Sequence, residues 1–408
     1  MSGDILFLAH RVPYPPDRGD KIRSWHLLRA MCKFARVHLV ALCDDARDLE
    51  HLDFLRSVAA SVHVEMRNTS KTRAMAAALL SHQPASVCAF ASAPLQAHVN
   101  DLLANQPIST IFAYSGQMAQ FVPNDLGGRR FVMDFVDMDS EKFATYAEQA
   151  SGPAAWANAF EAKRLRAFEI ATAKRATLSL FVSDAEAALF RQHSALGYDR
   201  VSHIENGIDL AAYDPSKTYT PVCEGEGPLL VFTGQMDYRP NVDAVTEFAR
   251  AALPLIRDRF PKARFAIVGR NPTSDVQALA ALPGVIVTGE VPDTRAWLAS
   301  ADIVVAPLML ARGIQNKVLE AMAMAKTVVA SPQAALGIDA SVGTEIIVAE
   351  GSAAQASEIC DLLTSPARLR TIGDAARHRI EARYGWDARL SGLASMLRMP
   401  ALMVEKAA

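Results

Sequence analysis

Short runs of β-branched and aliphatic residues alternate with longer helical patterns along most of the 408-residue chain. This alternation is typical of βαβ units, in which helices connect parallel strands. In the first half, the runs predict strands at residues 5–9, 37–43, 62–66, 111–114, 131–136, 178–183 and 201–204. In the second half, they predict strands at residues 229–233, 265–268, 285–288, 303–308, 327–330 and 345–348. The sequence therefore predicts an α/β protein with two doubly wound sheets.

The length of the chain and one polar segment predict two domains. A chain of 408 residues is too long for one ordinary hydrophobic core. Residues 214–228 are rich in Pro, Gly and charged residues, as linkers are. We expect an amino-terminal domain over residues 1–212, with one long helix at about 141–176, and a carboxyl-terminal domain over residues 225–385. A last helix, over about residues 386–408, has an apolar face that suits packing on either domain, including a return to the first.

The composition excludes several classes of protein. A net charge of −2 provides no general attraction to nucleic acid or to an anionic membrane, so we expect no nucleic-acid partner. The five cysteines are scattered and form no C-x-x-C pair, which indicates a reducing compartment without a disulfide framework or structural zinc. No apolar run approaches the roughly 20 residues of a membrane-spanning helix. We therefore expect a cytoplasmic protein that at most touches a membrane peripherally.

The segment from residue 301 to residue 337 combines features that suit a nucleotide. It is predicted as a strand, a polar loop with a glycine, a helix that begins near Gln315, and a second strand. The free N–H groups of a helix N-terminus bind phosphate, and Lys317 adds a positive charge there. Glu320, one turn further, can accept hydrogen bonds from ribose hydroxyls. The alternative is a plain strand–loop–helix with a surface lysine and glutamate.

The sequence VLEAMAMAKTVVAS at residues 318–331 resembles the donor-binding stretch of glycosyltransferase family 4. Members of this family are retaining enzymes with the GT-B fold, which implies two facing Rossmann-like domains with the active site in the cleft between them. In the family's E-x7-E motif, Glu320 takes the second glutamate position and Arg312 replaces the first. The resemblance implies a set of donor-binding residues: Gly234, Arg239, Arg312, Gly313, Gln315, Lys317, Leu319 and Glu320.

The sequence FTGQMDYRPNVDA at residues 232–244 resembles the first strand and phosphate-binding loop of the family's second domain. Family members commonly carry an arginine and a lysine here, whose places are taken by Gln235 and about Asn241. Arg239 is the cation in this loop, so we expect it to share stabilisation of the leaving diphosphate with Lys317. The alternative is that Arg239 simply belongs to the turn before a helix.

Two loops are predicted on the acceptor side. The sequence HRVPYPPDRGDKIRSWH follows the first strand, and its basic residues suit a phosphorylated acceptor such as a polyprenyl-diphosphate-linked saccharide. The alternative is a solvated basic helix. This loop contributes the predicted acceptor-side residues Arg18, Gly19, Asp20 and Arg23. With the pieces DFVDMDSEKF and GQMDYRPNVDA, it looks most like the sugar transferases associated with exosortase (PEP-CTERM) exopolysaccharide clusters.

Asp137 is the predicted catalytic residue of the first domain. In family 4, a histidine followed by an aspartate is often present near the reacting sugar, and here these places hold Val136 and Asp137. His10 is a weaker substitute for the histidine. Asp137 and Asp139 also spell D-x-D, the metal-binding motif of the other large glycosyltransferase architecture. That architecture lacks two nucleotide-binding domains, so we expect neither a metal nor another cofactor.

These features predict a retaining glycosyltransferase that moves a sugar from a nucleotide-sugar donor to a saccharide or lipid-linked saccharide. Asp137, Arg239 and Lys317 are its predicted catalytic residues. One alternative is a sugar-nucleotide 2-epimerase, which shares the architecture. Another is a non-catalytic nucleotide-sugar-binding scaffold, suggested by the replaced glutamate and histidine. A dinucleotide oxidoreductase is disfavoured, because no strand is followed by G-x-G-x-x-G.

Overall fold

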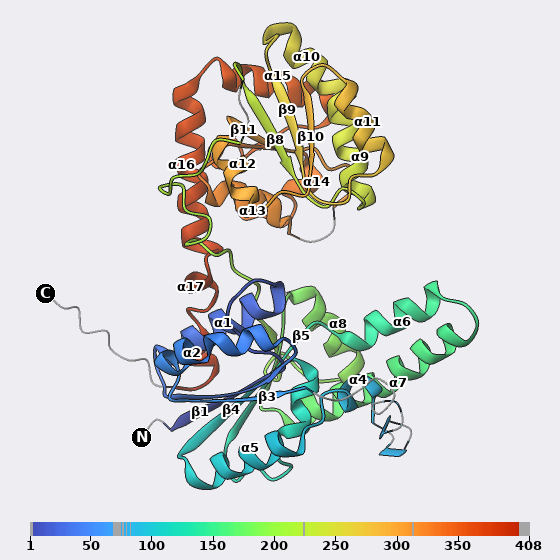
Figure 1. The fold of residues 1–408 in the computed structure, drawn as a ribbon, viewed down its shortest axis with the longest axis vertical. Helices are drawn as coiled ribbons and strands as arrows, with labels where there is room; N and C mark the ends of the chain where they lie inside the picture. Colours follow the sequence, from blue (N-terminus) through green and yellow to red (C-terminus); the bar gives the residue numbers. More distant parts are fainter. Residues whose placement is uncertain are drawn as a thin grey trace, which may run out of the picture. The chain divides into compact units, whose positions relative to one another are not determined.

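The computed structural model divides the chain into two compact units (Figure 1). The first unit contains residues 1–206 and 389–408, and the second contains residues 207–388. Within them the structure describes residues 3–67, 75, 77–78, 80–81, 83–222, 225–311 and 314–399. We describe each unit by itself, and the predicted cleft between two domains stays a prediction.

The first unit is built on a parallel sheet. In its described residues the sheet has seven strands in the order β3-β2-β1-β4-β5-β6-β7. They are β1 (Asp4–Ala9), β2 (Val37–Cys43), β3 (Ser61–Met66), β4 (Ile108–Tyr114), β5 (Arg130–Val136), β6 (Leu178–Phe181) and β7 (Val201–His203). Every residue of β1 and β2 is buried, as expected for central strands covered on both faces.

Helices cover both faces of this sheet. They are α1 (Gly19–Cys32), η1 (Ala46–His51), α2 (Leu52–Val58), α4 (Ala85–Cys88), α5 (Ala93–Asn105), η2 (Gly116–Phe121), α6 (Asp139–Gln149), α7 (Gly152–Arg175), α8 (Asp184–Ser194) and α18 (Leu393–Met396). Figure 1 shows α1 and α2 over one face and α5 over the other. On the α5 face, Leu95 and Val99 belong to one hydrophobic cluster with Leu6 and Leu8 of β1.

The long helix predicted at about 141–176 is wrong in one respect, because it is interrupted. Helix α6 ends at Gln149 and α7 begins at Gly152, and the two helices pack against each other as a hairpin (Figure 1). Gly152 has a positive φ of 62°, which favours glycine, and Pro153 has no N–H to continue a helix. The Gly-Pro pair therefore separates α6 from α7 and begins the second helix.

The second unit contains the other parallel sheet. Its described strands number six, in the order β10-β9-β8-β11-β12-β13. They are β8 (Leu229–Thr233), β9 (Arg264–Val268), β10 (Val285–Gly289), β11 (Ile303–Ala306), β12 (Val328–Ala330) and β13 (Ile347–Val348). The strand order reverses between β8 and β11, and ligands of doubly wound sheets bind beside such a reversal, at the carboxyl ends of the strands.

Helices surround this second sheet. They are α9 (Arg239–Glu247), η3 (Phe248–Ala252), α10 (Leu253–Arg259), α11 (Ser274–Ala278), η4 (Leu279–Ala281), α12 (Thr294–Ser300), α13 (Asn316–Ala323), α14 (Pro332–Ala335), α15 (Gly351–Leu363) and α16 (Pro366–Arg383). The short helix α17 (Trp386–Arg389) contains the boundary between the two units. All the predicted strands occur, with ends displaced by no more than three residues. The predicted fold class, two doubly wound α/β domains, is therefore confirmed.

The chain changes units at places that differ from the predicted boundaries. Ile208 already belongs to the second unit, where its backbone N–H donates to the Tyr384 carbonyl over 2.7 Å. Residues 389–408 belong to the first unit, where Arg130 donates to the Met396 carbonyl over 2.9 Å. Among the described residues, no helix has the length and apolar character needed to cross a membrane.

Candidate functional site

A cavity of about 470 Å³ lies in the second unit, at the carboxyl ends of its central strands. Gly234 follows β8, Gly269 follows β9 and Glu290 follows β10, while Lys317 and Glu320 come from α13. The lining residues are Tyr213, Thr233, Gly234, Gln235, Asn241, Val268, Gly269, Arg270, Glu290, Val291, Thr294, Lys317 and Glu320. The predicted donor residues Gly234, Lys317 and Glu320 thus line one cavity of the size that small ligands occupy.

Lys317 is held in an unusual environment for a lysine. Its ammonium group donates a hydrogen bond of 2.6 Å to Oδ1 of Asn241 and lies 4.2 Å from the centre of the Phe232 ring. Burial lowers the pKa of Lys317 to about 8, and the charge of Glu320 only partly opposes this shift. The side chain is thus a desolvated, positioned cation, which is the state in which an ammonium group interacts most strongly with an anion.

Glu320 shares the cavity with Lys317 and Tyr213. Burial raises the pKa of Glu320 to about 6, while a hydrogen bond with Tyr213 and the charge of Lys317 oppose the rise. Burial, together with the charge of Glu320, raises the pKa of Tyr213. Tyr213 had not been predicted as a site residue, although it lies in the segment that follows Asn206 and Gly207. A carboxylate fixed by a phenol is well placed to accept hydrogen bonds from ligand hydroxyls.

Two glycines make room for this arrangement. A Cβ atom on Gly234 would lie 3.1 Å from Nζ of Lys317 and 2.9 Å from Nδ2 of Asn241. Gly269 has a φ of +155°, and a Cβ atom there would lie 1.6 Å from the Gly234 carbonyl oxygen. Glycine at both positions therefore allows the ends of β8 and β9 to approach each other and the lysine.

The structure does not bring the predicted phosphate ligand Arg239 to this cavity. Arg239 begins helix α9, its side chain is 83% exposed, and it forms an ion pair of 2.8 Å with Asp243. Arg270 lines the cavity instead and donates over 3.3 Å to Oε1 of Gln235. An arginine at the first position of a helix can pair with the residue four further on, and here that pairing holds Arg239 on the helix surface.

Asn241 replaces a lysine that is common in the resembled family. It is 5% exposed, accepts from Lys317, and donates over 2.8 Å to the Gln235 carbonyl. It therefore fixes both the lysine and the loop after β8. The sequence did show that Asn241 is a polar residue at a position where relatives carry a cation. It could not show the partner of Asn241, because Lys317 is 76 residues away.

The other predicted donor residues have different surroundings. Leu319 is 3% exposed and packs in the hydrophobic core, so it supports α13 rather than lining the cavity. Gln315 is the N-cap residue of α13, and its backbone carbonyl accepts from the Val318 N–H. Arg312 and Gly313 lie outside the described residues.

In the first unit, Asp137 follows a strained residue at the end of β5. Val136 has a φ of +71°, which is costly for a β-branched side chain, and its N–H donates to buried Asp134 over 3.1 Å. Lys142 pairs with both Asp137 and Asp139, at 2.8 and 3.0 Å. An ammonium group thus lies between the two carboxylates of the D-x-D sequence. Among the described residues no group of three or more His, Cys, Asp or Glu is arranged to hold a metal ion.

The predicted acceptor-side residues separate into exposed and buried groups. Arg18 is exposed and pairs with Asp20 at 3.2 Å, and a Cβ atom on Gly19 would meet nothing within 4 Å. Although burial alone would raise it, hydrogen bonds from His10 and Arg11 hold the pKa of Asp20 well below its usual range. The acceptor-side role of Arg18, Gly19 and Asp20 stays a prediction.

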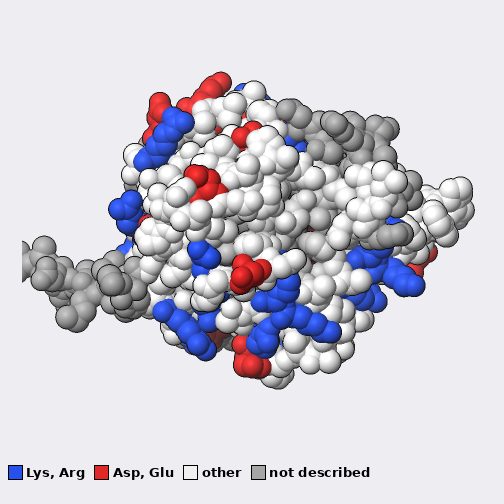
Figure 2. All heavy atoms as spheres, turned by 90° about the horizontal axis from the view of Figure 1, so that it is seen from below, with Lys and Arg blue, Asp and Glu red and all other residues white. Residues whose placement is uncertain are grey.

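Arg23 is buried rather than facing an acceptor, which corrects its predicted role. Its side chain is 1% exposed, and its guanidinium donates over 3.0 Å to Asp134 and over 2.7 Å to the Ile204 carbonyl. The ammonium group of Lys21 is also enclosed, between Asp17 and Asp48. The basic patch predicted from sequence is therefore partly neutralised inside the unit. On the face of the molecule drawn in Figure 2, basic side chains occur in small groups with acidic ones nearby.

Part of the second unit is similar in sequence to known proteins. Residues 227–365 match the family model described as glycosyl transferases group 1. A phosphatidyl-myo-inositol mannosyltransferase from Propionibacterium freudenreichii is 30% identical over 195 residues, which cover 45% of this chain and 47% of that protein. The match thus spans about half the length of the curated relative.

Solved structures resemble the whole chain. Sucrose-phosphate synthase from Thermosynechococcus elongatus has a TM-score of 0.58 at 18% identity, covering 97% of this chain and 98% of its own. HepE from Anabaena, in a complex with UDP and glucose, has a TM-score of 0.56 at 16% identity. The match covers 97% of this chain and 99% of HepE. At these identities the likeness establishes the fold. The chain therefore has the GT-B fold, and its residues 227–365 match the model of the glycosyl transferases group 1 family.

Proposed function

We propose that this protein is a glycosyltransferase that binds a nucleoside-diphosphate sugar in the cavity of the second unit. The observation that carries the proposal is the position of Lys317, a desolvated cation held between Phe232 and Asn241 beside the glycine turn after β8. Among the described residues no carboxylate forms an ion pair with this buried ammonium group, and such a group suits a diphosphate, whose charge would compensate for its desolvation.

The residues of the cavity have complementary tasks in this proposal. Lys317, Arg270 and the N-terminus of α13 bind the diphosphate, and Glu320, oriented by Tyr213, binds the ribose hydroxyls. When the bond from the anomeric carbon to the diphosphate breaks, the departing oxygen gains negative charge. Preorganised cations stabilise that charge without reorganisation, which is the main contribution to catalysis that these residues can make. Asp137 of the first unit is proposed to bind a hydroxyl of the donor or acceptor.

The relatives support a hexosyl donor. HepE is solved with UDP and glucose, and the curated relative is named as a mannosyltransferase. We propose a saccharide or polyprenyl-diphosphate-linked acceptor, retention of anomeric configuration without a metal, and a role in exopolysaccharide synthesis. The proposed location is the cytoplasm, with peripheral contact at the inner face of the membrane.

A donor panel tests the proposed function. We expect one or more of UDP-, GDP-, ADP- and dTDP-hexoses to raise the melting temperature in proportion to the logarithm of its concentration, and to be hydrolysed slowly without acceptor. Binding without transfer or hydrolysis would instead support the scaffold alternative. Release of an epimerised donor would support the 2-epimerase. The proposed site is wrong if no donor shifts the melting temperature.

The variants Arg270→Ala and Arg239→Ala test which arginine binds the donor: Arg270, which lines the cavity, or Arg239, which the sequence predicts. We expect Arg270→Ala to weaken donor binding about tenfold, the typical cost of losing a hydrogen bond to a charged group. Arg239→Ala should change binding less than twofold, because its guanidinium is exposed and paired with Asp243. Titration calorimetry measures both. If Arg239→Ala weakened donor binding more than Arg270→Ala, Arg239 would be the phosphate ligand, as predicted from the sequence.

Donor affinity should be highest between about pH 6 and pH 8. Lys317 binds a diphosphate only when protonated, so affinity should fall as the pH rises through its pKa of about 8. Glu320 accepts from ribose only when ionised, so affinity should fall as the pH drops through its pKa of about 6. Lys317→Met should remove the alkaline decrease and Glu320→Gln the acidic one. An affinity that is constant from pH 5 to pH 9 contradicts both assignments.

A further inference from the structure

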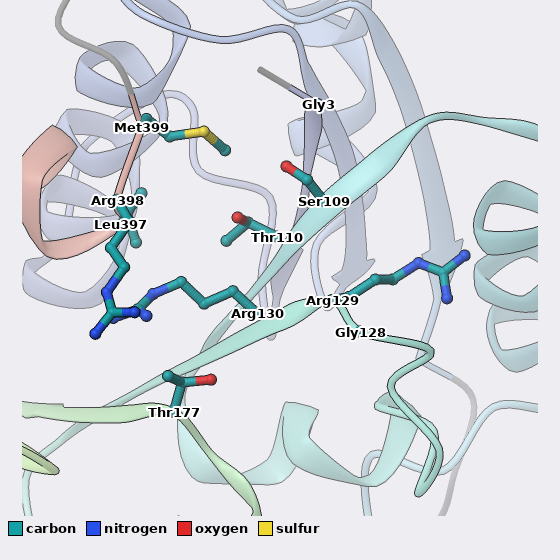
Figure 3. A pocket seen from close by; sticks show the side chains of 10 residues that line it. All are labelled: Gly3, Ser109, Thr110, Gly128, Arg129, Arg130, Thr177, Leu397, Arg398 and Met399. Carbon is teal, nitrogen blue, oxygen red and sulfur yellow. The ribbon is translucent and has the colours of Figure 1, made fainter. Parts of the chain in front are cut away.

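A second cavity, of about 520 Å³, lies in the first unit at the edge where its strands begin (Figure 3). Ser109 and Thr110 belong to β4, Arg130 begins β5, and Thr177 precedes β6. Arg398 follows α18 near the end of the described chain. Asp20, in the first turn of α1, and Asp137, just after β5, lie beyond the ends of the strands at the opposite edge of this sheet, so the cavity is separate from the predicted acceptor side.

Two guanidinium groups meet at this cavity without an acidic partner. Figure 3 shows the Arg130 and Arg398 side chains extending to the same place, whereas Arg129 points the other way. Burial lowers the pKa of Arg130, and the nearby charge of Arg398 lowers it further. Among the described residues, neither forms an ion pair with Asp or Glu. Adjacent arginines repel each other, so the pair costs free energy unless an anion joins it.

The cavity offers hydrogen-bond donors that are not fully used. The Nε group of Arg130 is buried and has no hydrogen-bond partner among the described residues, while its Nη2 group donates to the Met396 carbonyl over 2.9 Å. Thr177 accepts from the Phe131 N–H over 3.3 Å, which leaves its hydroxyl proton available. No acidic residue is among the described residues that line the cavity. A cavity lined with hydrogen-bond donors and without carboxylates suits a ligand whose polar atoms are hydrogen-bond acceptors.

The backbone also holds Arg398 in a costly conformation. Arg398 has a φ of 53°, in the left-handed region that non-glycine residues seldom adopt. Its neighbours Leu397 and Met399 are buried at 1% and 8% exposure, and they fix this part of the chain against the unit. The side chain of Arg398 is itself exposed, so it is directed to the mouth of the cavity at the expense of backbone strain.

We propose that this cavity binds the phosphate group of an anionic ligand between Arg130 and Arg398. Arginine pairs bind phosphate oxygens in a planar, forked geometry, and the hydroxyls of Ser109, Thr110 and Thr177 supply further donors. The phosphate belongs either to a soluble compound or to the headgroup of a phospholipid. The proposal does not depend on the transfer reaction, because the cavity lies in the other unit from Lys317.

Titration calorimetry with inorganic pyrophosphate tests the soluble source. The full chain carries Lys317→Ala in every sample, so that the donor cavity contributes little. We expect Arg398→Gln to weaken binding about tenfold or more, because it removes hydrogen bonds between charged groups. The matched control Arg36→Gln removes an exposed charge just before β2, at the same edge of the sheet, and should change binding less than twofold.

Flotation with vesicles tests the lipid source. Vesicles of phosphatidylcholine with and without phosphatidic acid are mixed with the same variants. Binding that requires phosphatidic acid and is lost in Arg398→Gln, but not in Arg36→Gln, supports the proposal with a lipid ligand. If the Lys317→Ala protein binds neither pyrophosphate nor these vesicles, or if both variants lose binding equally, the proposal is overturned. Arg398 is exposed, so its replacement leaves the fold intact, and a melting curve checks this.

Discussion

Replacement of Lys317 with methionine should reduce the rate of sugar transfer about 10²- to 10³-fold, the usual cost of losing one preorganised group that stabilises a departing oxyanion. Methionine is an apolar side chain of similar length, so it removes the positive charge that lies 4.2 Å from the centre of the Phe232 ring without shortening the side chain greatly. The loss should appear in kcat, because the interaction strengthens as the carbon–oxygen bond breaks and charge develops on the diphosphate. Steady-state kinetics with the donor identified by the panel measures the effect.

Lys262→Met is the matched control for this prediction. Lys262 belongs to the same unit, its side chain is 68% exposed, and it pairs with Glu226 on the surface. Its replacement should leave kcat unchanged within about twofold. Undiminished turnover in Lys317→Met would show that the diphosphate does not meet this lysine. An increase in KM alone would mean that Lys317 binds the ground state and the transition state equally well.

Replacement of Arg23 with methionine should destabilise β5 by about 3–5 kcal/mol, because it leaves the buried carboxylate of Asp134 without a counter-charge. Arg23 and Asp134 are 1% and 0% exposed, and the same carboxylate accepts from the N–H of strained Val136. Loss of the pair should therefore also loosen the conformation that presents Asp137. Hydrogen exchange of the β5 amides measures the effect, with β11 of the second unit as an internal reference.

Two further variants test whether the loss of β5 stability comes from the unpaired charge of Asp134. Arg29→Met removes an exposed arginine from the same helix α1 and should change the free energy of opening by no more than about 0.5 kcal/mol. Adding Asp134→Asn to Arg23→Met removes the unpaired charge but keeps an oxygen for Val136, so part of the stability should return. An Arg23→Met protein with unchanged β5 protection would contradict the structural role assigned here.

The strands were predictable because burial on both faces requires nearly continuous apolar runs. The ends of β2 and β8 agree with the prediction to the residue. The prediction of one continuous helix at about 141–176 was wrong, because the composition of this segment favours helix throughout. The interruption depends on the local Gly152–Pro153 pair. The donor motif was equally local: Lys317 and Glu320 lie one turn apart on one helix, so their presence in one cavity follows from their spacing.

The parts of the site that were missed depend on contacts between distant segments. In sequence, Arg239 is the cation of the phosphate loop, but its i+4 neighbour Asp243 holds it on the surface, and Arg270 from the loop after β9 lines the cavity. Asn241 and Tyr213 acquire roles only because folding brings them to Lys317 and Glu320. Sequence spacing carries no information about such pairs.

By itself, the sequence determined the order of strands and helices, the class of fold, and the helix that carries Lys317 and Glu320, because periodicity and short motifs act over a few residues. Only the tertiary structure decided which charged groups are buried and which remain available. It enclosed Arg23 with Asp134 and set Arg130 beside Arg398. The physical reason is that desolvation and ion pairing depend on distances across the whole unit, which packing of the sheets and helices establishes.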